Sequence, residues 1–381
     1  LVRPLGGLFW GPLGDRLGRK SVLALTILMM SGATLCVGLI PSYDRIGFWA
    51  PTLLVVLRMI QGFSTGGEYG GAATFMAEYA PDSKRGWCGS FLEFGTLAGF
   101  SAGALLMLGF SLALGDEAMH AWGWRIPFLV AAPMGLIGLY LRSKMEDTPV
   151  FREASAEAAT HAAPSAPSGG LKQLVTGHWR ELLVMSGLVI ALNVVNYTLL
   201  SYMPTYLQRR LGLSHNEALV VPIVGMLFMM VLLPFAGALS DRLGRKPLWW
   251  ASLIGLFVLV VPLYRLMATG MTGAVIGFAL LGALYVPQLA TISATFPAMF
   301  PTRVRFAGFA LAYNVATSVF GGTAPALNSG LIRATGDELF PAYYMMGACV
   351  IGATALVFLV ETAGMSLRDA GRRRQSRPAV R

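Results

Sequence analysis

The sequence predicts an all-α integral membrane protein built from two matching halves, and three observations support this fold class. First, 55% of the 381 residues are hydrophobic and 13% are charged, with a mean hydropathy of +0.62, whereas a soluble domain carries roughly a quarter charged residues. Second, long apolar runs follow one another along the chain. Third, the hexapeptide DRLGRK occurs twice, at 15–20 and 241–246.

Each apolar run is long enough to be considered as a helix across a membrane, because such a helix needs about 20 mostly apolar residues. An eleventh segment, residues 1–13, is too short to span alone. The chain begins inside this segment without an initiating Met, so we expect one whole helix to precede it. The ten predicted runs are 21–40, 52–79, 88–114, 124–143, 181–207, 218–239, 247–267, 271–298, 305–331 and 340–360.

A polar segment divides the runs into two groups that resemble each other. Its Pro-, Ser- and Gly-rich stretch at 163–170 is typical of a flexible connector. PDSKRG in the first group corresponds to PTRVRF, which lies 220 residues later in the second. Repeated halves of this kind are typical of six-plus-six transporters. We therefore predict an N-terminal bundle (1–143, helices 2–6), a cytoplasmic linker (144–180), a C-terminal bundle (181–362, helices 7–12) and a basic cytoplasmic tail (363–381).

The net charge of +10 is explained by membrane topology and not by nucleic-acid binding. If alternate connections face opposite sides, 21 of the 29 Lys and Arg residues lie on the side of the DRLGRK loops and six lie on the other. This bias follows the positive-inside rule, so the loops, linker and tail are expected in the cytoplasm. The three cysteines are scattered, and the chain contains no nucleotide-binding loop of the GxxxxGK[ST] kind. We expect no metal and no cofactor.

Several long motifs resemble a known family of transporters. G-x-x-x-D-R-x-G-R-K at 11–20 resembles the signature of the major facilitator superfamily. RMIQGFSTGGEYGGAATFMAEYAPDSKRG (58–86) and WGWRIPF (122–128) resemble its metabolite–proton symporter family. Three further stretches resemble the proline/glycine-betaine branch of that family: GSFLEFGTLAGF (89–100), NVVNYTLLSYMPTYL (193–207) and FPAMFPTRVRFAGFALAYN (296–314).

The resemblance implies a major facilitator fold of two pseudo-symmetric six-helix bundles, with the first helix absent from this chain. It implies uptake of a small zwitterionic osmolyte by proton symport and alternating access, by a monomer in the bilayer of the bacterial cytoplasmic (inner) membrane. The alternatives are a proton-coupled carboxylate symporter for 2-oxoglutarate, citrate or shikimate, a proton-independent facilitator, and a receptor on the same fold that does not transport. The tail shows no heptads, so osmosensing through a coiled coil is not implied.

The charged loops are candidates for a gate. The hexapeptide aspartate sits at a helix end, where it can pair with Arg or with the positive N-terminus of a neighbouring helix. In the family the loop locks the cytoplasmic side, and the resemblance implies the same here; the alternative is that it only fixes topology. The predicted gating residues are Asp15, Arg16, Arg19, Lys20, Arg85, Asp241, Arg242, Arg245 and Lys246.

Ionisable side chains inside the predicted spans are candidates for proton coupling, because each costs about 2.5–3.5 kcal/mol at the bilayer centre. The four histidines lie in predicted loops, so a carboxylate must carry the proton in this chain. We expect Glu68 to do so, with Glu93 as second candidate and Glu78 closer to the helix end. Arg58 is also a candidate for proton coupling, but it lies ten residues before Glu68 on the same predicted helix, too far to pair with it directly. The alternative for Glu68 is a permanent ion pair. Arg3 is expected to cap a helix or reach the membrane surface; the alternative is that it binds substrate.

Polar and aromatic side chains inside apolar runs predict the substrate site. Aromatic faces hold a quaternary ammonium, and amide, hydroxyl or Arg donors hold a carboxylate, so such a cluster suits a zwitterion. The alternative is that these residues join helices to one another. The candidates are Asn193, Asn196, Tyr197, Tyr202, Tyr285, Gln288, Tyr313 and Asn314.

Overall fold

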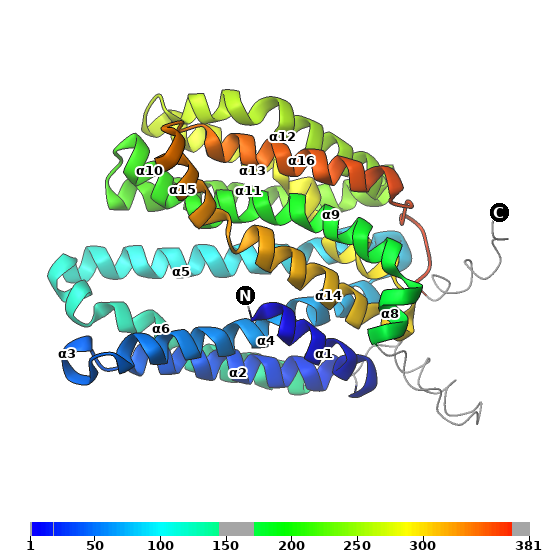
Figure 1. Cartoon of the computed structure of the whole chain (residues 1–381), viewed down its shortest axis with the longest axis horizontal. Helices are drawn as coiled ribbons and strands as arrows, with labels where there is room; N and C mark the ends of the chain where they lie inside the picture. The colour runs from blue at the N-terminus through cyan, green and yellow to red at the C-terminus, as the bar shows by residue number, and fades with distance from the viewer. Residues whose placement is uncertain (1, 18, 145–170, 368–381) are drawn as a thin grey trace.

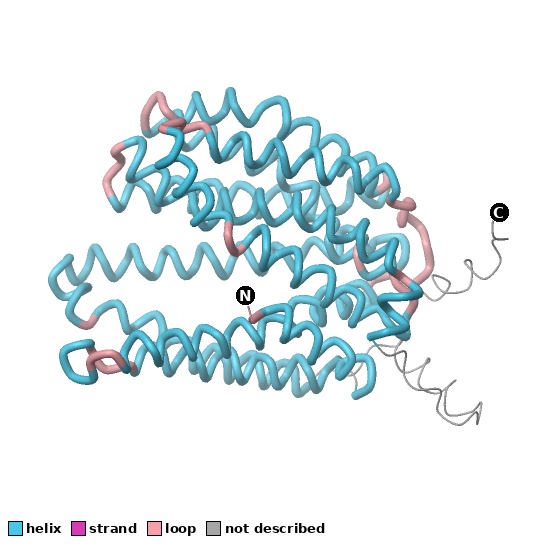
Figure 2. The backbone as a smooth tube through the Cα atoms, viewed as in Figure 1, coloured by secondary structure: helices cyan, strands magenta, loops and turns pink. Residues whose placement is uncertain are grey.

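The computed structural model describes residues 2–17, 19–144 and 171–367, which form helices joined by short connections and include no strand. Figure 2 shows that most of the loops gather at the two ends of the molecule. The helices before residue 145 are α1 (Arg3–Leu17), α2 (Arg19–Leu39), α3 (Tyr43–Ile46), α4 (Trp49–Tyr79), α5 (Arg85–Ala121) and α6 (Ile126–Lys144).

The helices after residue 170 include two π-helical turns, η3 (Tyr197–Tyr202) and η6 (Thr317–Gly321), each inside a longer apolar run. The other helices are α8 (Leu171–Gly177), α9 (Trp179–Asn196), α10 (Met203–Leu211), α11 (His215–Leu243), α12 (Arg245–Met267), α13 (Met271–Thr295), α14 (Arg305–Ala316), α15 (Ala324–Thr335) and α16 (Phe340–Phe358). Short 3-10 turns occur in both parts of the chain. For example, η1 (Asp82–Lys84) precedes α5, and η4 (Pro297–Met299) lies between α13 and α14.

Each of the ten predicted runs is helical, and eight helical segments in the described part of the chain are long and apolar enough to span a membrane. The run at 305–331 is not one continuous helix, because η6 and a turn separate α14 from α15. α4 is 31 residues long but is less apolar, since it contains Arg58, Glu68 and Glu78. The segment at 1–13 extends to Leu17 as α1.

The predicted linker begins and ends inside helices. α6 reaches Lys144, and both α8 and the start of α9 lie before residue 181. The Pro-, Ser- and Gly-rich stretch lies outside the described residues, as does the tail beyond residue 367.

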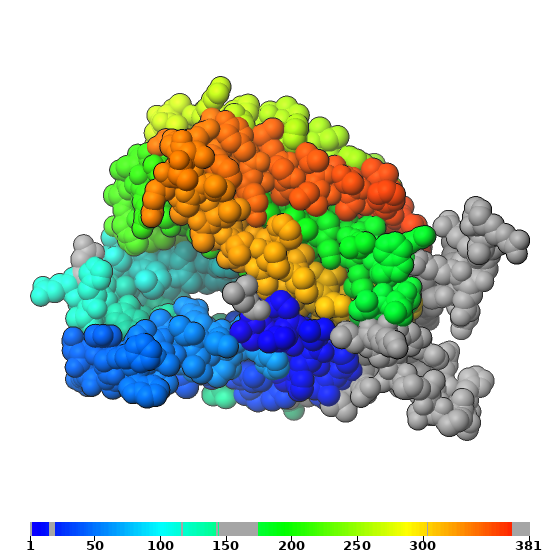
Figure 3. All heavy atoms as spheres, in the orientation of Figure 1, coloured from blue at the N-terminus to red at the C-terminus, as the bar shows by residue number. Residues whose placement is uncertain are grey.

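The helices form two groups that meet along one side, which we call the N-terminal half (residues 2–144) and the C-terminal half (residues 171–367). Figure 1 shows α1, α2, α4 and α6 side by side in one group and α9, α11, α12, α13 and α16 in the other. α5 packs against α11 and α13, and α1 packs against α14. Helices of both halves therefore line the boundary between the halves. The blue residues of α1 touch the yellow-orange residues of α14 in the space-filling view (Figure 3).

The buried core lies mainly in the C-terminal half, where large side chains such as Trp249, Phe278 and Tyr264 are almost fully buried. A second cluster joins the halves, because Trp10 and Val22 from one half pack with Phe306 and Ala310 from the other. The two halves therefore share apolar contacts near the end that carries the hexapeptide loops. We call this end of the molecule the charged end.

Candidate functional site

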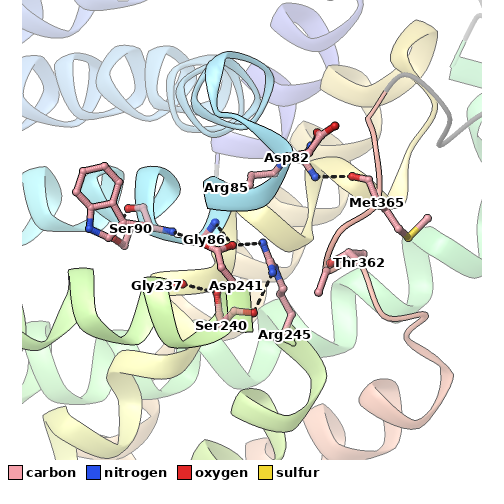
Figure 4. A network of polar contacts seen from close by, with 12 residues as sticks. Asp82, Arg85, Gly86, Ser90, Gly237, Ser240, Asp241, Arg245, Thr362 and Met365 are labelled. Atoms are coloured by element: carbon pink, nitrogen blue, oxygen red, sulfur yellow. Dashed lines mark hydrogen bonds and ion pairs between the residues drawn. The ribbon is translucent and has the colours of Figure 1, made fainter. Parts of the chain in front are cut away.

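The second hexapeptide joins the halves at the charged end (Figure 4). Asp241, near the end of α11, accepts hydrogen bonds from the backbone N–H groups of Gly86 and Trp87 over 2.8 and 2.9 Å. These groups belong to the first turn of α5, which has no helical acceptor for them, and the helix dipole favours a carboxylate there. Arg245 donates to the same carboxylate over 2.7 Å. Asp241 thus contacts both an Arg and the N-terminus of a neighbouring helix, the two partners expected for a hexapeptide aspartate.

The backbones approach closely at this contact, which explains its glycines. A Cβ placed on Gly237 would stand 2.5 Å from the carbonyl oxygen of Gly86. In the other half, a Cβ on Gly11 would stand 2.9 Å from the Cα of Ala307 at the start of α14. Gly11 and Gly237 each precede a hexapeptide aspartate by four residues. The α1–α14 and α11–α5 contacts are therefore equivalent.

Arg305 holds the halves together through a buried ion pair. Its guanidinium donates to Glu78 of α4 over 2.7 Å, and both side chains are 0% exposed. Its Nε donates to the carbonyl oxygen of Pro297. A buried charge needs such partners, because desolvation otherwise costs several kcal/mol. Glu78 therefore has a structural partner at the charged end.

Arg85 occupies the same position in the N-terminal half. Its Nε donates to the carbonyl oxygen of Ala77, eight residues earlier, as Arg305 does to Pro297. Its guanidinium also pairs with Asp82 and donates to the carbonyl oxygen of Met365 over 2.9 Å. Arg85, a predicted gating residue, is thus buried where the two halves meet.

The start of α12 is held by the segment that follows α16. Glu361 accepts hydrogen bonds from the backbone N–H groups of Arg245 and Lys246, and from those of Thr362 and Ala363. Burial raises the pKa of Glu361, but these four hydrogen bonds outweigh it and hold the pKa below its usual range. Lys246 Nζ donates to the carbonyl oxygens of Val357 and Leu359.

The remaining gating residues are described less completely. The side chains of Asp15, Arg16 and Arg19 lie outside the described residues, while Lys20 is half-buried and Arg242 is exposed. The charged end is therefore described mainly through the contacts of the second hexapeptide, residues 241–246.

A polar cluster lies between the halves near the middle of α4. Arg3 Nε donates to Asn314 Oδ1 over 2.6 Å, and the guanidinium lies 5.4 Å from the centroid of the Tyr313 ring. Asn314 Nδ2 donates to the carbonyl oxygen of Gly66 over 2.7 Å. Arg3 and Gly66 belong to the N-terminal half, so the cluster joins the two halves.

Glu93 belongs to the same cluster. Its carboxylate accepts a hydrogen bond from the hydroxyl of Tyr69 on α4, and Glu93 is 4% exposed. The Tyr69 ring stacks on Tyr313, with 4.5 Å between the centroids and 19° between the planes. A carboxylate of α5 is thereby linked through two rings to the guanidinium of Arg3.

Two further candidates for proton coupling, Glu68 and Arg58, lie on α4. Glu68 is half-buried, and Arg58 is exposed and donates to Gln61 over 3.2 Å. The structure thus places Glu93 in hydrogen-bond contact with Tyr69, one of the central aromatic residues.

The candidates on α9 and η3 are spread along the run. Asn193 bonds to the carbonyl oxygen of Val189 in its own helix. Tyr197 is half-buried beside Gly321 of η6. Asn196 is half-buried, whereas Tyr202 is 4% exposed and lies further along.

The two candidates on α13 are fully buried and point to different neighbours. Tyr285 donates to the carbonyl oxygen of Leu192 on α9 over 3.0 Å. Gln288 donates to Ser252 on α12 over 2.9 Å, inside the C-terminal half. Gln288 therefore joins two helices of one half.

Sequence reasoning missed Tyr69 and Arg305 as site residues. The available signal for Arg305 was its position 220 residues after Arg85, in the motif that repeats. Tyr69 directly follows Glu68 inside the Gly-rich run, and only the packing of α4 on α5 shows that it faces Glu93.

Residues 1–372 match the family model described as sugar (and other) transporter. The chain belongs to this family of the major facilitator superfamily. It is 44% identical over 374 residues to the glycine betaine/proline/ectoine/pipecolic acid transporter OusA of Dickeya dadantii, covering 97% of this chain and 74% of that protein. It is also 44% identical to the proline/betaine transporter of Escherichia coli K12, covering 97% of this chain and 75% of the relative.

The solved structures confirm the fold class. The proton:xylose symporter XylE bound to 6-bromo-6-deoxy-D-glucose has a TM-score of 0.76 at 18% identity, covering 97% of this chain and 86% of that one. The predicted major facilitator fold and the family resemblance are both confirmed. The protein is a multi-pass membrane transporter and not an enzyme.

Proposed function

We propose that the protein takes up a small zwitterionic osmolyte, such as proline or glycine betaine, by proton symport through alternating access. The central cluster carries this proposal, because it combines a guanidinium, stacked aromatic rings and a buried carboxylate between the halves. Relatives that are 44% identical carry proline and betaine in their names. The protein acts as a monomer, with one such cluster in each chain.

The cluster suits both charges of a zwitterion. The guanidinium of Arg3 can bind a carboxylate, and the face of Tyr69 that does not stack on Tyr313 can attract an ammonium group. A dicarboxylate would need a second cationic group and would be repelled by Glu93 when that residue is ionised. The arrangement thus favours an osmolyte over 2-oxoglutarate or citrate.

Glu93 is the proposed proton carrier. Its carboxylate is buried and bonded to Tyr69, so that proton binding changes the hydrogen bond next to the proposed substrate site. Glu68 is the second candidate. Glu68 lies on α4 and Glu93 lies on α5, and both helices contact the C-terminal half.

The charged end is proposed to face the cytoplasm and to be the closed gate in this structure. The excess of Lys and Arg on that side supports the orientation. The bonds of Asp241 to α5 and of Arg305 to Glu78 support the closure. The halves would then rock so that this end opens and the site reaches the cytoplasm.

Uptake by the full-length protein in proteoliposomes tests the proposal. Labelled glycine betaine or proline is expected to enter under an inward proton gradient, and a protonophore is expected to abolish accumulation. Glu93→Gln should lose proton-driven accumulation but keep exchange of internal for external substrate. Glu68→Gln is measured in the same way, and loss of accumulation in that variant instead would make Glu68 the proton carrier. Uptake that is insensitive to the protonophore would indicate a facilitator, and entry of 2-oxoglutarate or citrate alone would indicate the carboxylate branch. Binding without flux would indicate a receptor.

A further inference from the structure

The chain continues along the charged end after α16 ends. We call residues 359–367 the C-terminal strap. Leu367, its last residue, is 4% exposed and packs in one cluster with Ala77 and Ala298. Ala77 lies in α4 of the N-terminal half, and Ala298 lies in η4 of the C-terminal half. The Leu367 side chain is therefore buried between the two halves.

The backbone of the strap is held by the two repeated arginines. Arg85 donates to the carbonyl oxygen of Met365, and Arg305 donates to that of Leu367, each over 2.9 Å. Figure 4 shows the first of these bonds beside the Asp241 network. Because both guanidinium groups are almost fully buried, each needs its acceptors inside the protein. One segment thus supplies acceptors to an arginine of each half.

The beginning of the strap is attached to α12 of the C-terminal half. Glu361 accepts from the backbone of α12, and Leu359 accepts from Lys246. The contacts of the strap with Ala77 and Arg85 cross between the halves.

We propose that the C-terminal strap is a built-in lock of the charged end, which moves with the C-terminal half and releases Ala77 and Arg85 when this end opens. This inference rests on the proposed alternating access. Opening would expose the Leu367 side chain and would remove one acceptor from Arg85, and both changes favour the closed state. The strap therefore sets how often the charged end opens.

The separation of two spin labels across the charged end tests the lock without substrate. The labels are attached at Ser83→Cys and Leu243→Cys, two exposed positions in opposite halves, after Cys36, Cys88 and Cys349 are replaced. The full-length protein in nanodiscs is compared with chains that end after Leu367 or after Ala363. The first truncation keeps the strap, and only the second is expected to raise the population at long separation.

Leu367→Ala is the variant for the case in which the shorter chain does not fold. It removes the buried side chain but keeps the carbonyl acceptors, and we expect the ratio of open to closed molecules to rise about tenfold, which is about 1.4 kcal/mol. The lock is refuted if both the shorter chain and Leu367→Ala give the distances of the full-length protein.

Cross-linking shows to which half the strap is attached during transport. A short thiol-specific cross-linker between Leu367→Cys and Ala77→Cys joins the halves, and it is expected to stop uptake. The same reagent between Leu367→Cys and Ala298→Cys joins parts of one half, and it is expected to leave uptake active. Equal uptake by the two cross-linked proteins would overturn the proposal. A protein that carries no tested osmolyte but shows the expected label distances would refute the proposed substrate and not the lock.

Discussion

Arg85 and Arg305 occupy the same position in the two repeats, yet they bind different carboxylates. Each donates through Nε to a carbonyl oxygen eight residues earlier and through a terminal nitrogen to the C-terminal strap. Arg305 pairs with Glu78 of the opposite half, and both side chains are 0% exposed. Arg85 pairs with Asp82 of its own half, and the Asp82 side chain is 52% exposed.

The difference follows from one position in the repeat. The residue 220 positions after Glu78 is Ala298, which offers no carboxylate and instead packs against Leu367. The repeat thus supplies two equivalent arginine sites, while the ion pair that joins the halves exists in one of them only. Substitutions of Glu78 and Asp82 test this asymmetry directly, and those of Asp241 and Glu361 compare it with the other contacts of the charged end.

Glu78→Gln is expected to have the largest effect. It leaves the buried guanidinium of Arg305 without its counter-charge, and removal of one partner of a buried ion pair costs about 3–5 kcal/mol. The midpoint of thermal unfolding in detergent should fall clearly, and the labels across the charged end should separate. An unchanged midpoint would show that the carbonyl acceptors of Arg305 suffice.

Asp241→Asn is expected to come next. The variant keeps a side-chain oxygen as an acceptor but loses the negative charge that faces both Arg245 and the N-terminus of α5. We expect a cost of about 1–3 kcal/mol. The same unfolding measurement checks this value. A larger loss than that of Glu78→Gln would mean that the hexapeptide, and not the ion pair, dominates the closure.

Acid should weaken the attachment of the strap to α12. The pKa of Glu361 is lower in the folded protein than in the unfolded chain, so its stabilisation is present above the ordinary value of about 4.3 and is lost as the pH falls through the folded value. Thermal unfolding measured at pH values from 6 down to about one unit below the ordinary pKa of glutamate should show this loss. Glu361→Gln should remove the part of the pH dependence that this carboxylate causes; identical profiles for both proteins would contradict the assignment.

Asp82→Asn is expected to have the smallest effect, at most about 1 kcal/mol, because the Asp82 side chain is 52% exposed and solvent screens its charge. Asp82→Asn and Glu78→Gln each replace the carboxylate of one arginine site by the corresponding amide, so their effects can be compared directly. Similar shifts of the unfolding midpoint in the two variants would show that the two sites are energetically equivalent.

The repeat and the helices could be predicted from the sequence, because hydropathy and the two hexapeptides are local signals. Arg85 was predicted as a gating residue from its motif. The partner of Arg305 could not be predicted, since Glu78 is 227 residues away and only the meeting of α4 with α14 brings them together. The order of Glu68 and Glu93 likewise depended on which helix face packs inward, and the apolar runs on both helices leave that face undefined.

The π-helical turns lie within otherwise regular apolar runs, and the composition of these runs does not mark them. A π turn places one residue more in a turn than an α-helix does. Deleting one residue from Tyr197–Tyr202, which runs directly from α9 into α10, would therefore restore a regular helix and keep the flanking faces in register. A deletion elsewhere in α9 would rotate everything beyond it by about 100°. The π turn at Tyr197–Tyr202 is thus a place where this spanning segment can lose a residue without turning its far end away from its neighbours.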